Sequence, residues 1–370
     1  MGYELMVVET FLDATRFFKS DYQKSRQQFL AACQKVRYLP QESRSWNLPV
    51  EGPAELAVDA AYFGDPRADC VLVMISGTHG VEGYCGSAIQ SFLLHEINNQ
   101  THPFPNKLGL LMIHGLNPWG MYWARRCDHE GIDLNRNFPD FDQLPTPDPR
   151  QQQVLAALQA GSREARRDAL QQLARGWGQE TFERVLTEGQ YDTPWAPFYG
   201  GRGPSFSSGV IDEVMAHWQL AQRELVVIDL HTGLGPWAYG ELISDHPVDS
   251  NANRFARRLF GQAVANTFSG DSFSQPKHGL LDYRWHELMA QSGCYLTLEF
   301  GTYSTDNLLD VLCEEHIFWR DQAPRSLQDD GYPAVRERML KHFCPRDMLW
   351  QQAAAFKAWQ VMHRVVEFYS

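Results

Sequence analysis

Apolar residues follow two alternating patterns along the chain. Uninterrupted apolar runs of strand length predict buried strands, whereas apolar residues three or four positions apart predict helices. The predicted strands are residues 69–77, 107–117, 224–233 and 294–301, with an edge strand over 54–64. The predicted helices are residues 9–36, 84–97, 250–266, 281–291, 348–369 and one that begins at 306. This alternation predicts an α/β fold with three α/β/α layers around a mostly parallel mixed sheet.

Residues 145–224 interrupt this pattern. The first part is rich in Gln, Arg and Ala at helical spacing, and the part from Gln190 is dense in Gly, Pro and aromatic residues. We therefore predict a single domain over residues 1–370 that carries a helical and loop insertion over 145–224. We expect the insertion to cover a substrate pocket through Tyr191, Tyr199 and Arg202. An ornamental or oligomer-forming loop is the alternative.

The net charge limits the expected partners, and the cysteine content indicates the expected cellular location. The 370-residue chain has a formal net charge of −12, which argues against nucleic-acid and anionic-membrane partners because both need a basic face. No uncharged apolar run reaches the roughly 18 residues of a membrane span. The first residues also lack the order of a signal peptide. Seven scattered cysteines without a CxxC pair predict reduced thiols and a cytoplasmic location.

Three predicted strands end on residues that can bind a metal or transfer a proton. His79 and Glu82 follow the first strand, Asp229 and His231 end the second, and Glu299 ends the third. Ligands gather at the carboxyl ends of strands in open α/β sheets. We therefore expect these side chains, which are far apart in sequence, to meet at one edge of the sheet.

The first of these groups lies in the stretch ISGTHGVEGYCGSA. Two His and one carboxylate form a common catalytic zinc shell, which makes His79, Glu82 and His231 candidate ligands. The glycines allow a sharp turn that brings His79 and Glu82 to one ion. Asp229 could orient a ligand or join a second metal. The alternative is a tight turn whose side chains cap backbone groups, with His231 a satisfied histidine at a strand end.

Glu299 ends an otherwise apolar strand. A carboxylate in such a place is costly unless it is paired or protonated. This favours a general base that acts on metal-bound water, and a structural salt bridge is the alternative. The segment 117–141 adds Arg125, Arg126, Asn135 and Arg136. Arginine binds carboxylates and oxyanions, although a solvated surface loop would also fit this segment.

Together these motifs carry a family resemblance. HGVEG, NPWGM followed by Arg, GIDLNRNF, a later strand-borne His and a still later strand-borne Glu occur in this order between about residues 71 and 303. The chain resembles the zinc carboxypeptidase superfamily. The resemblance implies a zinc carboxypeptidase-like fold, zinc bound by His79, Glu82 and His231, and Glu299 as general base. It implies one zinc ion, with a second, co-catalytic ion as the alternative.

The resemblance also assigns the substrate contacts. Asn135 and Arg136 match the pair that holds a terminal carboxylate, and Arg125 or Arg126 matches the arginine that stabilises the tetrahedral intermediate, with Arg125 preferred. The phenol of the peptide carboxypeptidases has only the candidates Tyr283 and Tyr303. Some features of the sequence differ from those of the peptide carboxypeptidases. DLHTG is closer to the succinylglutamate desuccinylase and aspartoacylase group, and the insertion resembles a bacterial subgroup of carboxypeptidase-like proteins.

These inferences predict a zinc-dependent hydrolase that cleaves an amide bond, most simply a carboxypeptidase-type metallopeptidase. Its expected partner is a peptide or N-acyl amino acid with a free carboxylate, and a homo-oligomer is left open. An N-acyl amino acid deacylase is the first alternative. A non-catalytic binding module on the same scaffold is the second alternative, but such a module would be expected to lack a metal ligand or the general base. No GxSxG nucleophile elbow is present.

Overall fold

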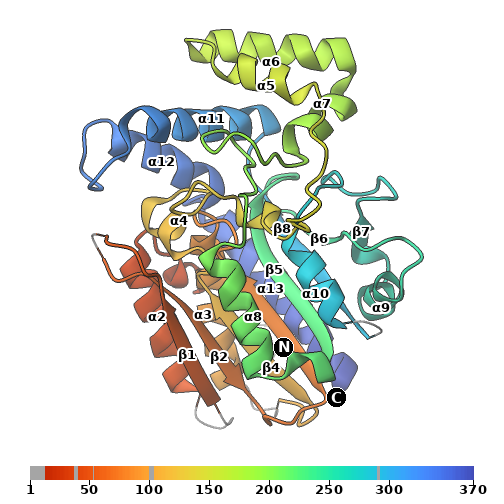
Figure 1. The fold of residues 1–370 in the computed structure, drawn as a ribbon. Helices are drawn as coiled ribbons and strands as arrows, with labels where there is room; N and C mark the ends of the chain where they lie inside the picture. The colour runs from red at the N-terminus through yellow and green to blue at the C-terminus, as the bar shows by residue number, and fades with distance from the viewer. Residues whose placement is uncertain (1–12, 37–40, 53, 100–103, 290–291) are drawn as a thin grey trace.

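A mixed β-sheet runs through the centre of the protein (Figure 1). The structure is a computed structural model that describes residues 13–36, 41–52, 54–99, 104–289 and 292–370. The sheet has eight strands in the order β1-β2-β4-β3-β5-β8-β6-β7. The strands are β1 (Gln41–Asn47), β2 (Ala57–Phe63), β3 (Cys70–Ser76), β4 (Leu108–His114), β5 (Glu224–Gly233), β6 (Gly240–Ser244), β7 (Val264–Asn266) and β8 (Gly293–Gly301).

The four central strands, β4, β3, β5 and β8, are parallel to one another. β2 joins this group antiparallel to β4, and β6 joins it antiparallel to β8. The carboxyl ends of the four central strands therefore meet at one edge of the sheet. The register of β5 and β8 places His231 opposite Glu299 at that edge.

Helices cover both faces of the sheet. Side chains alternate between two cores, because Leu72 and Met74 of β3 pack on one face while Val71 and Val73 pack on the other. The first face is covered by α2 (Tyr22–Lys35), α3 (Gly83–Asn99), α9 (Asn251–Phe260) and α13 (Met348–Tyr369). The second is covered by α8 (Phe206–His217) and α10 (Leu281–Met289). The predicted three-layer α/β/α fold with a mostly parallel mixed sheet is confirmed.

A further group of helices lies beyond the carboxyl ends of the strands. In Figure 1, α5, α6 and α7 are stacked at the top of the molecule, above α11 and α12. Arg163 of α6 forms ion pairs with Asp310 and Glu314 of α11, at 3.4 and 3.2 Å. The bounds are α4 (Pro118–Trp123), α5 (Gln151–Leu158), α6 (Arg163–Trp177), α7 (Gln179–Thr187), α11 (Thr305–Gln322) and α12 (Tyr332–Phe343). Of residues 145–224, α8 packs on the sheet itself; the division into a domain and an insertion stays a prediction.

Two predicted helices are shorter in the structure. The helix expected over 9–36 is divided into a 3₁₀ turn, η1 (Ala14–Phe17), and α2, and residues 9–12 lie outside the described part. Asp21 begins α2 by accepting a hydrogen bond from the Lys24 amide. The helix expected over 250–266 ends at Phe260, because Gly261 has a φ of +66°. The turn η4 (Gly261–Ala263) and strand β7 follow.

The edge of the sheet differs from the prediction. β2 was expected at the edge, but it is buried along its whole length between β1 and β4. β1, with the sequence QESRSWN, is the edge strand, and its polar composition gave no strand signal. β6, β7 and α12 were also missed. Among the described residues, no helix combines the length and apolarity that crossing a membrane requires.

Candidate metal centre

The loop between β3 and α3 folds tightly around His79 and Glu82. Gly77 begins the turn with a φ of +77°, a conformation that favours glycine. A Cβ atom on Gly80 would lie 2.1 Å from the backbone carbon of Gly120, so only glycine fits against the neighbouring loop. The amides of Gly80 and Val81 donate to the carbonyls of Arg126 and Arg125, at 3.3 and 2.8 Å. The glycines therefore let the two loops approach each other closely.

His79, Glu82 and His231 come together as the sequence predicts. All three are buried, and they form a group whose candidate ligand atoms lie within 4.8 Å of one another. Nδ1 of His79 lies 2.9 Å from Oε1 of Glu82, and Nδ1 of His231 lies 3.2 Å from Oε2. The two Nδ1 atoms are 3.1 Å apart. It is the one such group found within the described residues.

These separations fit a tetrahedral zinc ion. Zinc bonds of about 2.0–2.1 Å at tetrahedral angles place neighbouring ligand atoms about 3.3 Å apart. The two Nε2 atoms face carboxylates, at 3.1 Å from Asp133 for His79 and at 2.7 Å from Asp229 for His231. A proton on each Nε2 leaves both Nδ1 lone pairs directed at the same point as the Glu82 oxygens. Carboxylate contacts of this kind are typical of zinc-binding histidines.

Asp229 lies two residues before His231 on β5, and its carboxylate contacts Nε2 of His231. Its carboxylate also accepts hydrogen bonds from Thr78 Oγ1 at 2.9 Å and from Tyr295 Oη at 2.7 Å. These contacts fit an orienting group, the first of the two roles that the sequence left open.

Asp133 is a residue of the metal centre that sequence reasoning missed. It lies in GIDLNRNF, where it contacts His79, accepts from Nε of Arg126 at 2.8 Å and caps η2 (Leu134–Arg136) through the Asn135 amide at 3.0 Å. Its only sequence signal is its place two residues before NRNF, a position typical of a helix cap. Asp133 therefore ties the NRNF segment to the metal centre.

Charge in this cluster is strongly coupled. Burial alone would raise the pKa of Glu82, but His79 and His231 hold it well below its usual range. Burial opposes a charge on His231, yet Asp229 and Glu82 raise its pKa well above the ordinary value. The cluster thus favours a positive charge at its centre. Metal binding to such a group releases protons and depends on pH.

Glu299 of β8 lies opposite His231 of the neighbouring strand β5, so its carboxylate belongs to the same candidate metal centre. One of its oxygens accepts a hydrogen bond from the Leu234 amide at 3.0 Å. Burial, and then the negative charge of Glu82, raise the pKa of Glu299 to about 7, although His231 opposes the shift. A carboxylate whose pKa is near neutral is suited to exchange protons with a substrate.

The two neighbouring arginines lie in different surroundings. Nη1 of Arg126 is 3.3 Å from Oε1 of Glu82, so its guanidinium lies at the metal centre. Arg125 instead forms a buried ion pair with Glu315 and stacks over Trp319, with its Cζ 4.2 Å from the ring centroid. The structure therefore places Arg126, and not the preferred Arg125, beside the candidate reacting groups.

A cavity of about 150 Å³ opens over the metal centre. It is lined by His79, Glu82, His231 and Glu299, and by Arg126, Asn135 and Arg136. Glu183, Thr187 and Phe198 of the predicted insertion also line it. Two further charged residues of the lining, Asp245 and Lys277, were not singled out by the sequence.

The predicted tyrosines occupy supporting positions. Within the described residues, Tyr199, Tyr283 and Tyr303 are not part of the cavity lining. Tyr199 is buried in the core around α8, and its carbonyl accepts from the Asp133 amide at 2.8 Å. Tyr283 donates to the carbonyl of Lys277 at 2.8 Å, and the ring of Tyr303 packs 5.0 Å from that of Trp237.

Tyr191 and Arg202, the other expected contacts of the insertion, also lie outside the cavity lining of the described structure. Tyr191 donates to the carbonyl of Arg136 at 2.9 Å. Arg202 pairs with Asp192 at the surface.

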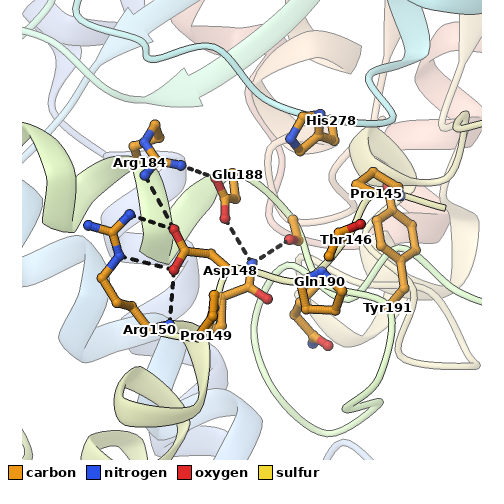
Figure 2. Close-up of a pocket in the computed structure, with 13 residues that line it drawn as sticks. Pro145, Thr146, Asp148, Pro149, Arg150, Arg184, Glu188, Gln190, Tyr191 and His278 are labelled. Atoms are coloured by element: carbon orange, nitrogen blue, oxygen red, sulfur yellow. Dashed lines mark hydrogen bonds and ion pairs between the residues drawn. The ribbon is translucent and has the colours of Figure 1, made fainter.

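A larger cavity, of about 530 Å³, is lined by residues 145–151 and by residues around Glu188 and His278. Figure 2 shows Arg184 between Asp148 and Glu188, with Arg150 also bound to Asp148. The distances are 2.6 Å from Arg184 to Glu188 and 2.6 Å from Arg150 to Asp148. The charges of Asp148, Arg150, Arg184 and Glu188 are therefore paired with one another.

The chain belongs to the family described as "Protein of unknown function (DUF2817)", whose pattern matches residues 18–357. A search of curated proteins finds no significant match.

Solved structures of similar fold include proteins of two kinds. Carboxypeptidase A from Helicoverpa armigera is 14% identical over 93% of this chain and 72% of its own, with a TM-score of 0.48. Bovine thrombin-activatable fibrinolysis inhibitor is 12% identical over 93% and 97%, with a TM-score of 0.43. An aspartoacylase family protein from Mesorhizobium loti is 11% identical over 76% and 68%, with a TM-score of 0.37. Similarities of this size do not bear on activity.

Proposed function

We propose that this protein is a zinc-dependent hydrolase that cleaves the amide bond next to a free carboxylate, in the manner of a carboxypeptidase. The observation that carries the proposal is the convergence of His79, Glu82 and His231 on one point, with Glu299 on the adjacent strand. Zinc bound there would polarise the scissile carbonyl and lower the pKa of water. Each remaining role falls to a side chain that lines the same cavity.

Glu299 is the proposed general base. Its carboxylate, opposite His231 on the adjacent strand, would accept a proton from the attacking water and then deliver that proton to the leaving amine nitrogen. Arg126 is the proposed group that stabilises the negative charge that develops on the carbonyl oxygen. Its contacts with Glu82 and Asp133 hold the guanidinium in place before the substrate arrives.

Arg136 is the proposed anchor for the substrate's carboxylate. It is buried, it lines the cavity, and its three hydrogen bonds to other described residues all go to backbone carbonyls. Two of its five N–H groups therefore stay free for a carboxylate. Asn135, which also lines the cavity, accepts from the Leu281 amide at 3.0 Å through Oδ1, so its amide nitrogen is available beside Arg136. An anchored carboxylate would fix the scissile bond over the metal centre.

The test is hydrolysis by purified protein with and without zinc. One substrate set contains peptides with free C-termini, and the other contains single N-acyl amino acids. We expect hydrolysis that is lost on chelation and regained with zinc, and the faster set separates the peptidase from the deacylase. Glu299→Gln should bind zinc normally and lose on the order of a hundredfold or more in kcat. A Glu299→Gln protein with full activity, or wild-type protein inactive on both sets, would overturn the proposal.

A further inference from the structure

Two cations line the metal-centre cavity without a carboxylate partner. Among the described residues, neither Arg136 nor Lys277 has a carboxylate oxygen within 4.0 Å, although Arg126 in the same cavity has two such contacts. Burying an unpaired charge is costly, so proteins rarely keep one without a use. Arg136 is only 1% exposed, and the proposed function uses it for one substrate carboxylate. The proposed function gives no role to Lys277.

Lys277 is held in place by its own loop. Its ammonium donates to Oγ of Ser274 and, at 2.8 Å, to the carbonyl of Gln275. An ammonium has three N–H donors, so one remains for the cavity. The Tyr283 hydroxyl holds the Lys277 carbonyl, and the next amide, that of His278, donates to the Glu188 carbonyl at 2.9 Å. The loop therefore fixes the direction of Lys277.

Carboxylates act on Arg136 and Lys277 from beyond ion-pair distance. For Arg136 the strongest opposite charge is that of Asp133, and for Lys277 it is that of Asp245. Asp245 interacts electrostatically with both Lys277 and Arg136 but lies within 4.0 Å of neither, and Oδ1 accepts from Thr267 at 2.9 Å. Burial raises the pKa of Asp245, and the positive charges of Lys277 and Arg136 oppose this shift. Burial, followed by the positive charges of Arg136 and Arg126, lowers the pKa of Lys277 to about 8 despite Asp245, so the ammonium is still charged at neutral pH.

We propose that Lys277 binds a second anionic group on the leaving residue, so that the preferred leaving residue is a dicarboxylic amino acid. Arg136 binds one carboxylate and Lys277 the other, and this assignment rests on the proposed function. The cavity volume of about 150 Å³ fits this class. Drug-sized ligands occupy pockets of about 300–1,000 Å³, so this space suits a single small residue.

Binding of free amino acids tests the inference without any need for catalysis. Isothermal titration of zinc-loaded protein with L-glutamate, L-glutamine and L-leucine compares ligands of similar size. A charge-assisted contact predicts that glutamate binds about 10- to 100-fold more tightly than glutamine. Lys277→Met should remove this difference and leave glutamine and leucine binding unchanged, whereas Lys277→Arg should keep it. Lys357→Met, at a partly buried lysine of α13 outside the cavity lining, is the matched control.

Equal binding of glutamate and glutamine by the wild-type protein would overturn the inference, as would a preference that survives Lys277→Met. Hydrolysis rates are a separate readout. If glutamate binds with the predicted dependence on Lys277 but no amide substrate is cleaved, the proposed hydrolase function fails and the dicarboxylate site stands. If acidic and neutral leaving residues are released at equal kcat/KM by an active enzyme, the hydrolase stands and the role of Lys277 fails.

Discussion

Nε2 of His79 lies 3.1 Å from Oδ1 of Asp133, a residue 54 positions away whose other oxygen binds Arg126. This single carboxylate joins a candidate metal ligand to the arginine assigned to the carbonyl oxygen. It also caps the turn that presents Asn135 and Arg136. The metal centre and the substrate-binding segment are therefore one connected structure.

Replacing Asp133 by Asn should weaken zinc binding about 10- to 100-fold, because the amide is a poorer acceptor for the His79 proton. Competition with a chromogenic chelator measures the affinity. Asp142→Asn, at an exposed position in the same segment, is the control and should bind zinc like the wild type. Unchanged zinc affinity in Asp133→Asn would show that the contact does not support the metal centre.

Replacing Arg125 by Met and replacing Arg126 by Met should have different effects on activity. Arg126→Met removes the donor at the cavity and should lower kcat of the folded protein about 10²- to 10³-fold. It also leaves Asp133 buried without its guanidinium partner, so both variants should be less stable and kcat separates them. Arg125→Met leaves Glu315 buried without its partner, so it should lower the free energy of unfolding by about 3–5 kcal/mol. Kinetics and denaturant unfolding on both variants check the assignment. The opposite outcome, a stable but inactive Arg125→Met, would restore Arg125 as the catalytic arginine.

Gly80→Ala should disrupt the metal centre, because the added methyl group would overlap the backbone at Gly120. We expect loss of stoichiometric zinc and a lower melting temperature. Gly176→Ala is the matched control, since a Cβ in α6 meets nothing within 4 Å, and alanine there should stabilise the protein by roughly 0.5–1 kcal/mol. A Gly80→Ala protein with normal zinc content would mean that the loops are not packed as described.

His114 should make the protein sensitive to acid. Burial lowers its pKa from 6.5 to about 4, with Asp59 opposing the shift, so the folded state favours the neutral ring. Its contribution to stability is complete above pH 6.5 and is lost as the pH falls toward 4, by about 3 kcal/mol.

Unfolding free energies measured between pH 7 and 4 should therefore fall less steeply in His114→Gln than in the wild type. His363→Gln, at a half-exposed histidine of α13, should keep the wild-type slope. Identical slopes in all three proteins would rule out this role for His114.

The sequence predicts those parts of the fold and site that depend on local pattern. The central strands were predictable because each is a continuous apolar run, buried on both faces. His79, Glu82 and His231 were identifiable because metal ligands need particular side chains at strand ends. Asp133 was not, because a carboxylate before NRNF has the same local signal whether it caps a turn or also contacts a distant histidine.

Features that depend on tertiary packing could not be predicted from the pattern of apolar and polar residues. β1 has no apolar alternation, and only its pairing with β2 makes it a strand. Arg125 and Arg126 are adjacent in sequence, and their roles differ because Glu315 of α11 packs against only one of them. Lys277 belongs to no motif, and it gains its significance from the cavity that it shares with Arg136.

Anomalous diffraction at the zinc edge, measured from crystals of the zinc-loaded protein, would show whether His79, Glu82 and His231 bind the ion. We predict one anomalous peak about 2.0–2.2 Å from Nδ1 of His79, Nδ1 of His231 and the carboxylate of Glu82, with Glu299 facing it. A peak held by other residues, or zinc-loaded crystals with no peak among these three side chains, would contradict the account.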